Sequence, residues 1–208
     1  MVRTGIEDML KTLLATAVVA MTAFTGANPA AAAGPGGFAR NLRDTPTVSF
    51  IAARTPTLAP FAHVKFCMQN PAECKKSSGS SVIAMTSYRE NQLKRVNSSV
   101  NRSVRAVNDS SATDGGDVWQ VSGGSGDCED FALIKRKRLI AMGWSPRALR
   151  IAVARTGSGE GHAVLVVKTS RGDLVLDNRT TAIRNWKNTD LRWVKIQSGD
   201  NPRIWYNI

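Results

Sequence analysis

The spacing of hydrophobic positions predicts two helices in the first two thirds of the chain. Between residues 81 and 108 the apolar side chains recur at helical spacing, with Arg, Asn and Ser between them. This stretch is predicted to form one long helix, or two joined end to end. A second helical pattern begins at Cys128 and ends near Gly143, with Asp127 in position to cap its first turn. The glycine-rich residues 110–126 form a loop that leads directly to Cys128.

After Pro146 the pattern changes to short runs rich in β-branched and aromatic residues. These runs cover residues 149–155, 163–168, 173–177, 193–196 and 203–206. Because helices come first and strands later, we expect an α+β domain in which N-terminal helices pack on an antiparallel β-sheet.

The chain opens with a charged and then an apolar segment. Arg3 and Lys11 lie before an apolar run at residues 13–24, and small residues follow at 30–33. This layout is typical of a secretory signal peptide cleaved near Ala33. The apolar run is shorter than the ~20 residues that a bilayer span needs, and no later segment comes close, so we expect no membrane span.

Cleavage divides the chain into three predicted parts: a signal peptide (1–33), an extended lead-in (34–60) and a domain (61–208). The lead-in is rich in Gly, Pro, Thr and Ala and has little periodicity. The 175 residues that remain (208 minus 33) suit one domain, which we expect to be a monomer.

The composition is strongly basic. The chain has 28 Lys and Arg against 16 Asp and Glu, a net charge of +12. Such a charge attracts nucleic acid, anionic lipid, lipopolysaccharide or acidic proteins without distinguishing them. Apart from the run at residues 135–138 the basic residues are scattered, which favours a solvated surface over a specific anion site, and we expect no specific nucleic-acid partner.

The three cysteines divide into a pair and a single residue. Cys67 and Cys74 bracket a short loop that contains a proline, and an oxidising compartment would let them form a disulfide. A zinc pair is the weaker interpretation, because no second ligand pair is present. Cys128 is left as a buried apolar residue, an intermolecular partner or a reactive thiol.

The neighbours of Cys128 favour the reactive thiol. It lies at the start of a predicted helix, where unpaired backbone N–H groups and the helix dipole favour a thiolate. A nearby histidine would supply the cation, and the chain has only His63 and His162. We favour His162, because it opens a predicted strand after a glycine-rich stretch, whereas His63 lies in a poorly patterned region.

Strand geometry suggests the third member of a triad. If the strands on either side of residues 169–172 form a hairpin, Lys168 faces Asp173. Side chains alternate between the two faces of a sheet, so His162 and Asp177 would then be diagonal neighbours on one face. A slip of one residue would move Asp177 to the other face.

Three motifs resemble those of a known family, the bacterial transglutaminase-like cysteine proteinases of the papain-like superfamily. They are GDCEDFA at residues 126–132, GHAVL at 161–165 and LDN at 176–178, in the family's order. The segment VNSSVNR at 96–102 is similar to one that precedes the cysteine in such proteins, and Trp119 to a tryptophan found there. The resemblance covers roughly residues 60–205.

The resemblance implies a papain-like fold and hydrolysis of peptide bonds through a thioester. Cys128 would attack the carbonyl, His162 would shuttle the proton and Asp177 would hold the ring, with Asn178 as an alternative. The Cys128 backbone N–H would be one oxyanion donor, and Gln120 or Trp119 would contribute to the rest.

Periplasmic members of the family are calcium-dependent proteases that clip large surface adhesins. By resemblance, Asp127, Glu129 and Asp130 would hold calcium beside the nucleophile, and the protein would be periplasmic or secreted and act on a surface or periplasmic protein. The alternative is that Asp127 caps the helix while Glu129 and Asp130 stabilise its positive end.

Two other functions remain open. The same triad could transfer an acyl group to an amine, as a transglutaminase does. A non-catalytic module could instead keep the fold and bind an anionic partner through its basic surface.

Overall fold

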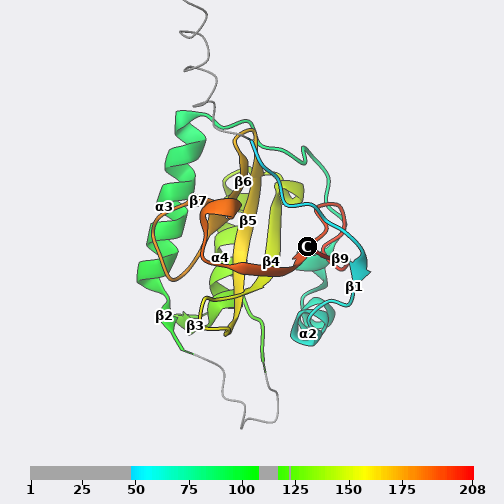
Figure 1. Ribbon diagram of the computed structural model, residues 1–208. Coiled ribbons are helices and arrows are strands. Elements are labelled where there is room, and N and C mark those ends of the chain that lie inside the picture. The colour runs from blue at the N-terminus through cyan, green and yellow to red at the C-terminus, as the bar shows by residue number, and fades with distance from the viewer. Residues whose placement is uncertain (1–47, 108–116, 122) are drawn as a thin grey trace, which may run out of the picture. The chain divides into compact units, whose positions relative to one another are not determined.

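An antiparallel β-sheet forms the centre of the domain (Figure 1). The structure, a computed structural model, describes residues 48–107, 117–121 and 123–208. In this part of the chain the sheet has seven strands in the order β1-β9-β8-β4-β5-β6-β7, and every pairing is antiparallel. Their bounds are β1 Pro56–Thr57, β4 Leu149–Arg155, β5 Gly161–Thr169, β6 Gly172–Leu176, β7 Arg184–Asn185, β8 Arg192–Gln197 and β9 Trp205–Asn207. The α+β prediction is confirmed.

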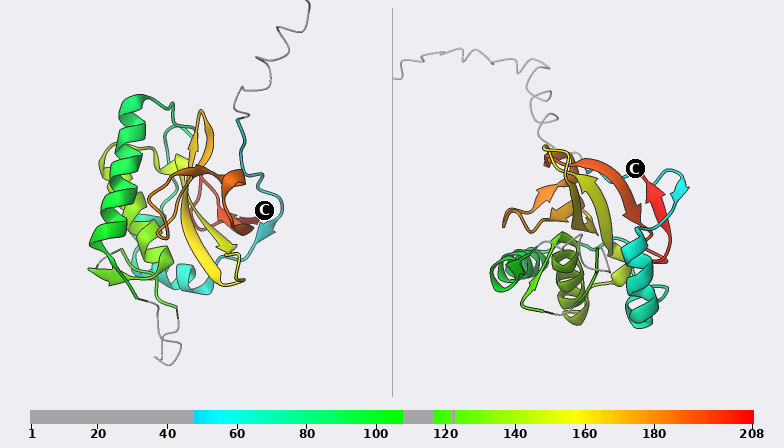
Figure 2. Two further views of the ribbon diagram at one scale, coloured as in Figure 1. Left: turned by 60° about the vertical axis from the view of Figure 1, so that its left-hand side comes forward. Right: turned by 90° about the horizontal axis from the view of Figure 1, so that it is seen from below.

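Three α-helices lie on one face of this sheet (Figure 2). They are α2 Phe61–Gln69, α3 Ser87–Ser103 and α4 Cys128–Ala141, with 3-10 turns at Pro71–Cys74, Pro146–Ala148 and Trp186–Asn188. The predicted long helix begins later than its apolar pattern does, because the Thr86 side chain accepts a hydrogen bond from Arg89 N at 3.2 Å and caps the first turn. A two-stranded parallel ribbon of β2 (Arg105–Ala106) and β3 (Ser125–Gly126) leads into α4.

Apolar residues on the two faces of the sheet form separate core clusters. The cluster under the helices is made by residues of α3, α4 and the central strands: Leu93, Val96, Val100, Phe131, Ala132, Leu139, Leu165, Val167 and Leu176 are among its members. The other face carries Ala152, Val164, Val166 and Ile196, covered by Ile51 and partly by Trp186 and Trp193. Strand β5 is buried on both sides, which agrees with its run of Val, Leu and Ala.

A buried ion pair ties the segment before β1 to the sheet. Asp173 is fully buried and accepts hydrogen bonds from Arg150 Nη2 at 2.8 Å and from Ile51 N at 2.7 Å. The backbone of Ser49 approaches Gly172 so closely that a Cβ there would lie 2.6 Å from Ser49 O. The described part of the predicted lead-in is therefore anchored to the sheet. The predicted signal peptide and residues 34–47 of the lead-in lie outside the described residues.

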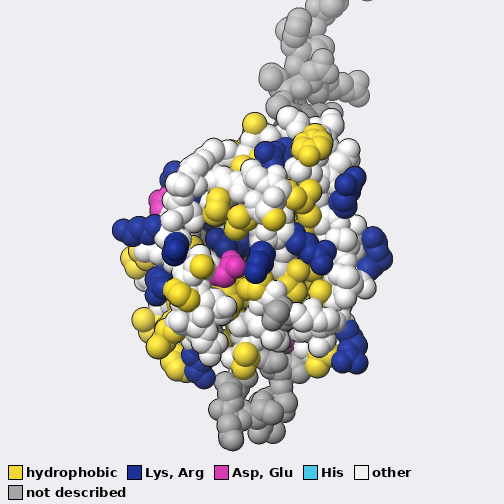
Figure 3. Space-filling view, turned by 180° about the vertical axis from the view of Figure 1, so that it is seen from behind, with side chains coloured by type: hydrophobic (Ala, Val, Ile, Leu, Met, Phe, Trp, Pro, Cys, Tyr) yellow, Lys and Arg dark blue, Asp and Glu magenta, His cyan; other side chains and the backbone are white. Residues whose placement is uncertain are grey.

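Basic side chains are distributed across the face of the molecule drawn in Figure 3. Figure 3 shows Lys and Arg side chains interspersed with apolar and uncharged ones over the face opposite to that of Figure 1. None of the helices described here combines the length and the apolar character needed to cross a lipid bilayer.

Candidate active site

The ribbon of β2 and β3 positions Cys128 at the first residue of α4. Asp127 is the N-cap residue, with φ −101° and ψ −164°. Gly126 directly before it has to be glycine, because a Cβ at this position would overlap the carboxylate of Asp130. The Cys128 side chain is partly exposed, and it is the free cysteine of the chain.

The hairpin of β5 and β6 brings His162 and Asp177 together. Lys168 pairs with Asp173, which confirms the predicted register, and Gly172 closes the turn with a φ of +95°. His162 Nε2 lies 2.9 Å from Asp177 Oδ1, and both side chains are less than a tenth exposed. The carboxylate therefore fixes one ring nitrogen and leaves Nδ1 for another partner.

Arg179 holds Asp177 in its ionised form. Asp177 Oδ2 accepts hydrogen bonds from Arg179 Nε at 3.1 Å and Nη2 at 2.9 Å, and Oδ1 accepts one from Arg179 N at 2.9 Å. Although burial opposes ionisation, the hydrogen bonds with His162 and Arg179 keep the pKa of Asp177 well below its usual range. No role was predicted for Arg179 from the sequence. The feature that could have indicated one is the position of this basic residue, two residues after the predicted aspartate.

The thiol of Cys128 makes two hydrogen bonds. Sγ accepts one from Ala163 N at 3.2 Å and donates one to Glu129 Oε2 at 3.1 Å. Burial, followed by the charge of Glu129, raises the pKa of the Cys128 thiol far above its usual range. Burial and the adjacent carboxyl group therefore oppose the lowering of this pKa that the helix start is expected to produce.

A cavity of about 660 Å³ opens beside the thiol. Cys128 and His162 both line it, at the junction of α4 and β5. Pro60, Trp119 and Val153 form an apolar part of its wall. This arrangement offers a polypeptide access to the thiol and the imidazole together.

Three carboxyl groups converge at the edge of this cavity. Asp117, Asp127 and Glu129 each place one carboxylate oxygen within 4.8 Å of those of the other two. Burial, followed by the neighbouring carboxyl groups of Asp117 and Asp127, raises the pKa of Glu129 to about 10. Clustered hard oxygens of this kind suit calcium. Asp117 was missed by the sequence analysis, because a long loop separates it from the GDCED motif.

Asp130 lies outside that group of three. Its Oδ1 accepts a hydrogen bond from Gln120 N at 2.7 Å, and its side chain is almost fully buried. It therefore holds the loop before the nucleophile. The Gln120 residue is exposed and does not line the cavity, whereas Trp119 and Asn178 do. Trp119 Nε1 donates to Asp117 Oδ2 at 3.2 Å.

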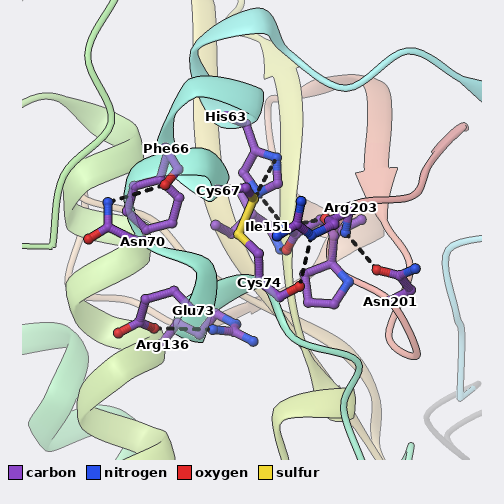
Figure 4. The surroundings of a disulfide bond; sticks show 12 residues. His63, Phe66, Cys67, Asn70, Glu73, Cys74, Arg136, Ile151, Asn201 and Arg203 are labelled. Atoms are coloured by element: carbon purple, nitrogen blue, oxygen red, sulfur yellow. Dashed lines mark hydrogen bonds and ion pairs between the residues drawn. A yellow bond between two sulfur atoms is a disulfide. The ribbon is translucent and has the colours of Figure 1, made fainter.

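The predicted disulfide between Cys67 and Cys74 is confirmed, with Cα atoms 5.5 Å apart (Figure 4). His63 lies against it, with Nε2 3.5 Å from Cys67 Sγ, and its ring packs edge-on against Trp119 and Trp205 at 5.2 Å. Burial, followed by the positive charge of nearby arginines, lowers the pKa of His63 to about 4. His63 is therefore a core residue. The disulfide stabilises α2, which begins directly after the cavity residue Pro60.

One family model and several solved structures match this chain. The model of the bacterial transglutaminase-like cysteine proteinases (BTLCP) matches residues 53–208. Among solved structures, LapG of Legionella pneumophila is 30% identical, with a TM-score of 0.49, over 57% of this chain and 67% of that one. Its calcium-bound and EGTA-treated forms are 29% identical with the same TM-score, over 57% and 58% of this chain and 68% of theirs. No curated protein matches the chain.

The family match spans most of the chain, from the anchored segment before β1 to the C-terminal residue. It includes the α4 cysteine and the β5 histidine that face one cavity. The chain belongs to the bacterial transglutaminase-like cysteine proteinases and is a cysteine peptidase.

Proposed function

We propose that the protein is an exported protease that hydrolyses peptide bonds with a Cys128, His162 and Asp177 triad. The observation that carries this proposal is the contact of 2.9 Å between His162 Nε2 and Asp177 Oδ1, beside a cavity that Cys128 also lines. A cysteine and a histidine on one cavity, with a carboxylate that orients the histidine, are the groups that thioester chemistry needs.

The proposed reaction uses His162 Nδ1, the ring nitrogen that does not contact Asp177. His162 Nδ1 takes the thiol proton, and Asp177 balances the imidazolium charge. Cys128 Sγ attacks the carbonyl carbon of the peptide, and the backbone N–H of Cys128 donates to the developing oxyanion. The imidazolium then protonates the leaving amine, which leaves a thioester. Water, deprotonated by the same imidazole, hydrolyses the thioester and restores the thiol.

Calcium is the cofactor that the acidic cluster fits. We assign its ligands to Asp117, Asp127 and Glu129, in place of the set with Asp130 expected from sequence. When bound, calcium would place a positive charge beside the carboxyl groups that raise the thiol pKa. For Gln120 and Trp119 we propose positioning roles in place of the oxyanion role expected from sequence: Gln120 N in the loop donates to Asp130, and Trp119 Nε1 donates to Asp117. Asn178 lines the cavity, while Asp177 is the residue that contacts His162.

A periplasmic or secreted location agrees with the disulfide and the predicted signal peptide. Disulfides persist in oxidising compartments, and the Cys67–Cys74 bond is buried in the core. We propose a surface or periplasmic protein as substrate. The open cavity with its apolar wall suits an extended polypeptide.

The proposal is tested by alkylation of Cys128. Purified protein lacking residues 1–33 is treated with iodoacetamide at pH 6.5 with and without calcium, and the label is mapped by mass spectrometry. We expect rapid labelling with calcium that is lost in His162→Ala, and loss of proteolysis in Cys128→Ala. Cleavage that persists in Cys128→Ala, or a thiol that stays unreactive under both conditions, contradicts the triad. Incorporation of a fluorescent amine into protein, in place of cleavage, would instead show acyl transfer.

A further inference from the structure

Asp190 lies outside the catalytic cavity, yet hydrogen bonds connect it to the triad through one side chain. Among the described residues, Arg179 lines the cavity and Asp190 does not. Arg179 follows β6 in the chain, and Asp190 lies shortly before β8. The Asp190 side chain is 62% exposed, so neither its burial nor its place in the sequence marks it as part of a site.

The Arg179 guanidinium uses two different edges for two carboxylates. Its Nε and Nη2 donate to Asp177 Oδ2 at 3.1 and 2.9 Å. Its Nη1 donates to Asp190 Oδ2 at 3.0 Å, and its Nη2 donates to Asp190 Oδ1 at 2.8 Å. The contact with Asp190 is therefore a bidentate pair, in which the planar fork of an arginine matches a carboxylate. A lysine carries a compact point charge and could not hold both carboxylates in this geometry.

Asp190 belongs to a segment that is anchored on both sides. Leu191, the next residue, is buried in the core cluster on the sheet face opposite to the helices. The preceding residue, Thr189, donates a hydrogen bond from Oγ1 to Trp186 O at 2.8 Å. Because the backbone around it is held, Asp190 is a fixed acceptor that restricts the rotamers open to the long Arg179 side chain.

The side chain of Asp177 depends on Arg179 more than its backbone does. Its backbone is held from α3, since Asn101 Nδ2 donates to Asp177 O at 2.9 Å. Its carboxylate lies between the Arg179 side chain at Oδ2 and His162 Nε2 at Oδ1. An ionised carboxylate only accepts hydrogen bonds, so His162 Nε2 carries the proton of that contact. A rotation of the carboxylate would therefore break the contact that orients the imidazole.

We propose that Asp190 is a positioning residue of the triad: it fixes the Arg179 guanidinium, which in turn holds the Asp177 carboxylate against His162 Nε2. The inference rests on the proposed triad and deepens it, because it adds a residue that lies outside the cavity. The Arg179 side chain is 34% exposed. Loss of Asp190 would let it turn toward solvent and would loosen the contact between Asp177 and His162.

The test is the rate at which the His162 Nε2 proton exchanges with water, measured by NMR in a Cys128→Ala background. The chain has two histidines, and the signal of His162 is the one lost in His162→Ala. We expect Asp190→Asn, which keeps the size of the side chain and removes its charge, to speed this exchange about fivefold. The matched control Asp200→Asn breaks another exposed pair, with Arg147, and should change the rate by less than about 1.5-fold.

A double-mutant cycle identifies the route of the effect. Arg179→Met should speed the exchange by more than Asp190→Asn does, and adding Asp190→Asn to it should have no further effect, because Asp190 acts through the guanidinium. Arg179→Lys keeps the charge without the fork and should behave as Arg179→Met does; it replaces Arg179→Met in the cycle if that variant fails to fold. The proposal is overturned if Asp190→Asn exchanges at the rate of Asp200→Asn, or if its effect persists in full without Arg179.

Alkylation of Cys128 connects the contact to the chemistry. In the chain that retains Cys128, labelling by iodoacetamide at pH 6.5 with calcium should be slower in Asp190→Asn than in Asp200→Asn. A merely structural role of Asp190 would lower the thermal unfolding midpoint and leave both rates unchanged. Equal labelling of the two variants would also overturn the proposal. A failure of the triad itself would appear differently, as an unreactive thiol in the wild-type protein, whereas the exchange rate is measured without the thiol.

Discussion

The Cys128 thiol donates its hydrogen bond to Glu129 Oε2, at 3.1 Å, and not to the imidazole of His162. The thiol proton, which the reaction has to remove, is therefore directed at Glu129, the residue next to the nucleophile. Because Glu129 is also a member of the carboxyl cluster, a cation bound there would compete directly with the thiol for this side chain. The relationship connects metal binding to nucleophile activation within two adjacent residues.

Asp117→Asn should weaken calcium binding by at least about tenfold, because it removes one of three clustered carboxylates. Isothermal titration calorimetry measures the affinity, and alkylation of Cys128 at pH 7 should lose its response to calcium in the same variant. Glu160→Gln is the matched control, since Glu160 lines the cavity but is not a member of the cluster. Equal effects of the two substitutions would argue against the assigned ligands.

Calcium binding should release close to one proton at pH 7. The pKa of Glu129 is raised to about 10, so this group is protonated at neutral pH and has to lose its proton to bind the metal. Titrations in two buffers of different ionisation enthalpy measure the proton count. The apparent affinity should also rise with pH, approaching tenfold per unit. A pH-independent affinity between pH 6 and 9 would mean that Glu129 loses no proton when the metal binds.

His63 should reduce the stability of the fold in mild acid. Its pKa of about 4 in the folded state lies below the ordinary 6.5, so the unfolded chain takes up the proton first. Stability is therefore full above pH 6.5 and falls as the pH drops toward 4, by about 3 kcal/mol in total. Urea denaturation at several pH values should show a smaller slope over this window in His63→Phe than in the wild type. Identical slopes would mean that His63 keeps an ordinary affinity for protons.

Asp173→Ala should cost about 3–5 kcal/mol of the free energy of unfolding, because it leaves the Arg150 guanidinium buried without its partner. It also removes the acceptor that anchors Ile51. Asp200→Ala is the control: Asp200 pairs with Arg147 at the surface, where it is 72% exposed, and its loss should cost less than about 1 kcal/mol. Chemical denaturation compares the two, and similar costs would contradict the role assigned to the buried pair.

Several features of this protein follow from local sequence patterns. The predicted strand at residues 149–155, which contains Ile151 and Val153, is β4 with the same bounds. The register of Lys168 against Asp173 follows from the length of the turn between them, and the seven-residue separation of Cys67 and Cys74 suits a short disulfide loop. Such features depend on neighbours in the chain, for which periodicity and turn chemistry are direct signals.

Helix α2 was not predicted, because Phe61–Gln69 shows little separation of polar and apolar faces. Its buried residues pack against the disulfide and two tryptophans distant in sequence. The helix is stabilised by that packing and not by an amphipathic pattern.

The sequence by itself determined the class of fold and the disulfide pair, and it predicted Cys128, His162 and Asp177 as a triad, of which His162 and Asp177 are in contact. Only the tertiary structure decided how their protons are held. Asp117 joins the carboxyl cluster, Arg179 donates hydrogen bonds to Asp177, and Glu129 accepts the hydrogen bond of the Cys128 thiol. The reason is that pKa values depend on burial and on charges brought close through space, and neither is encoded in local spacing.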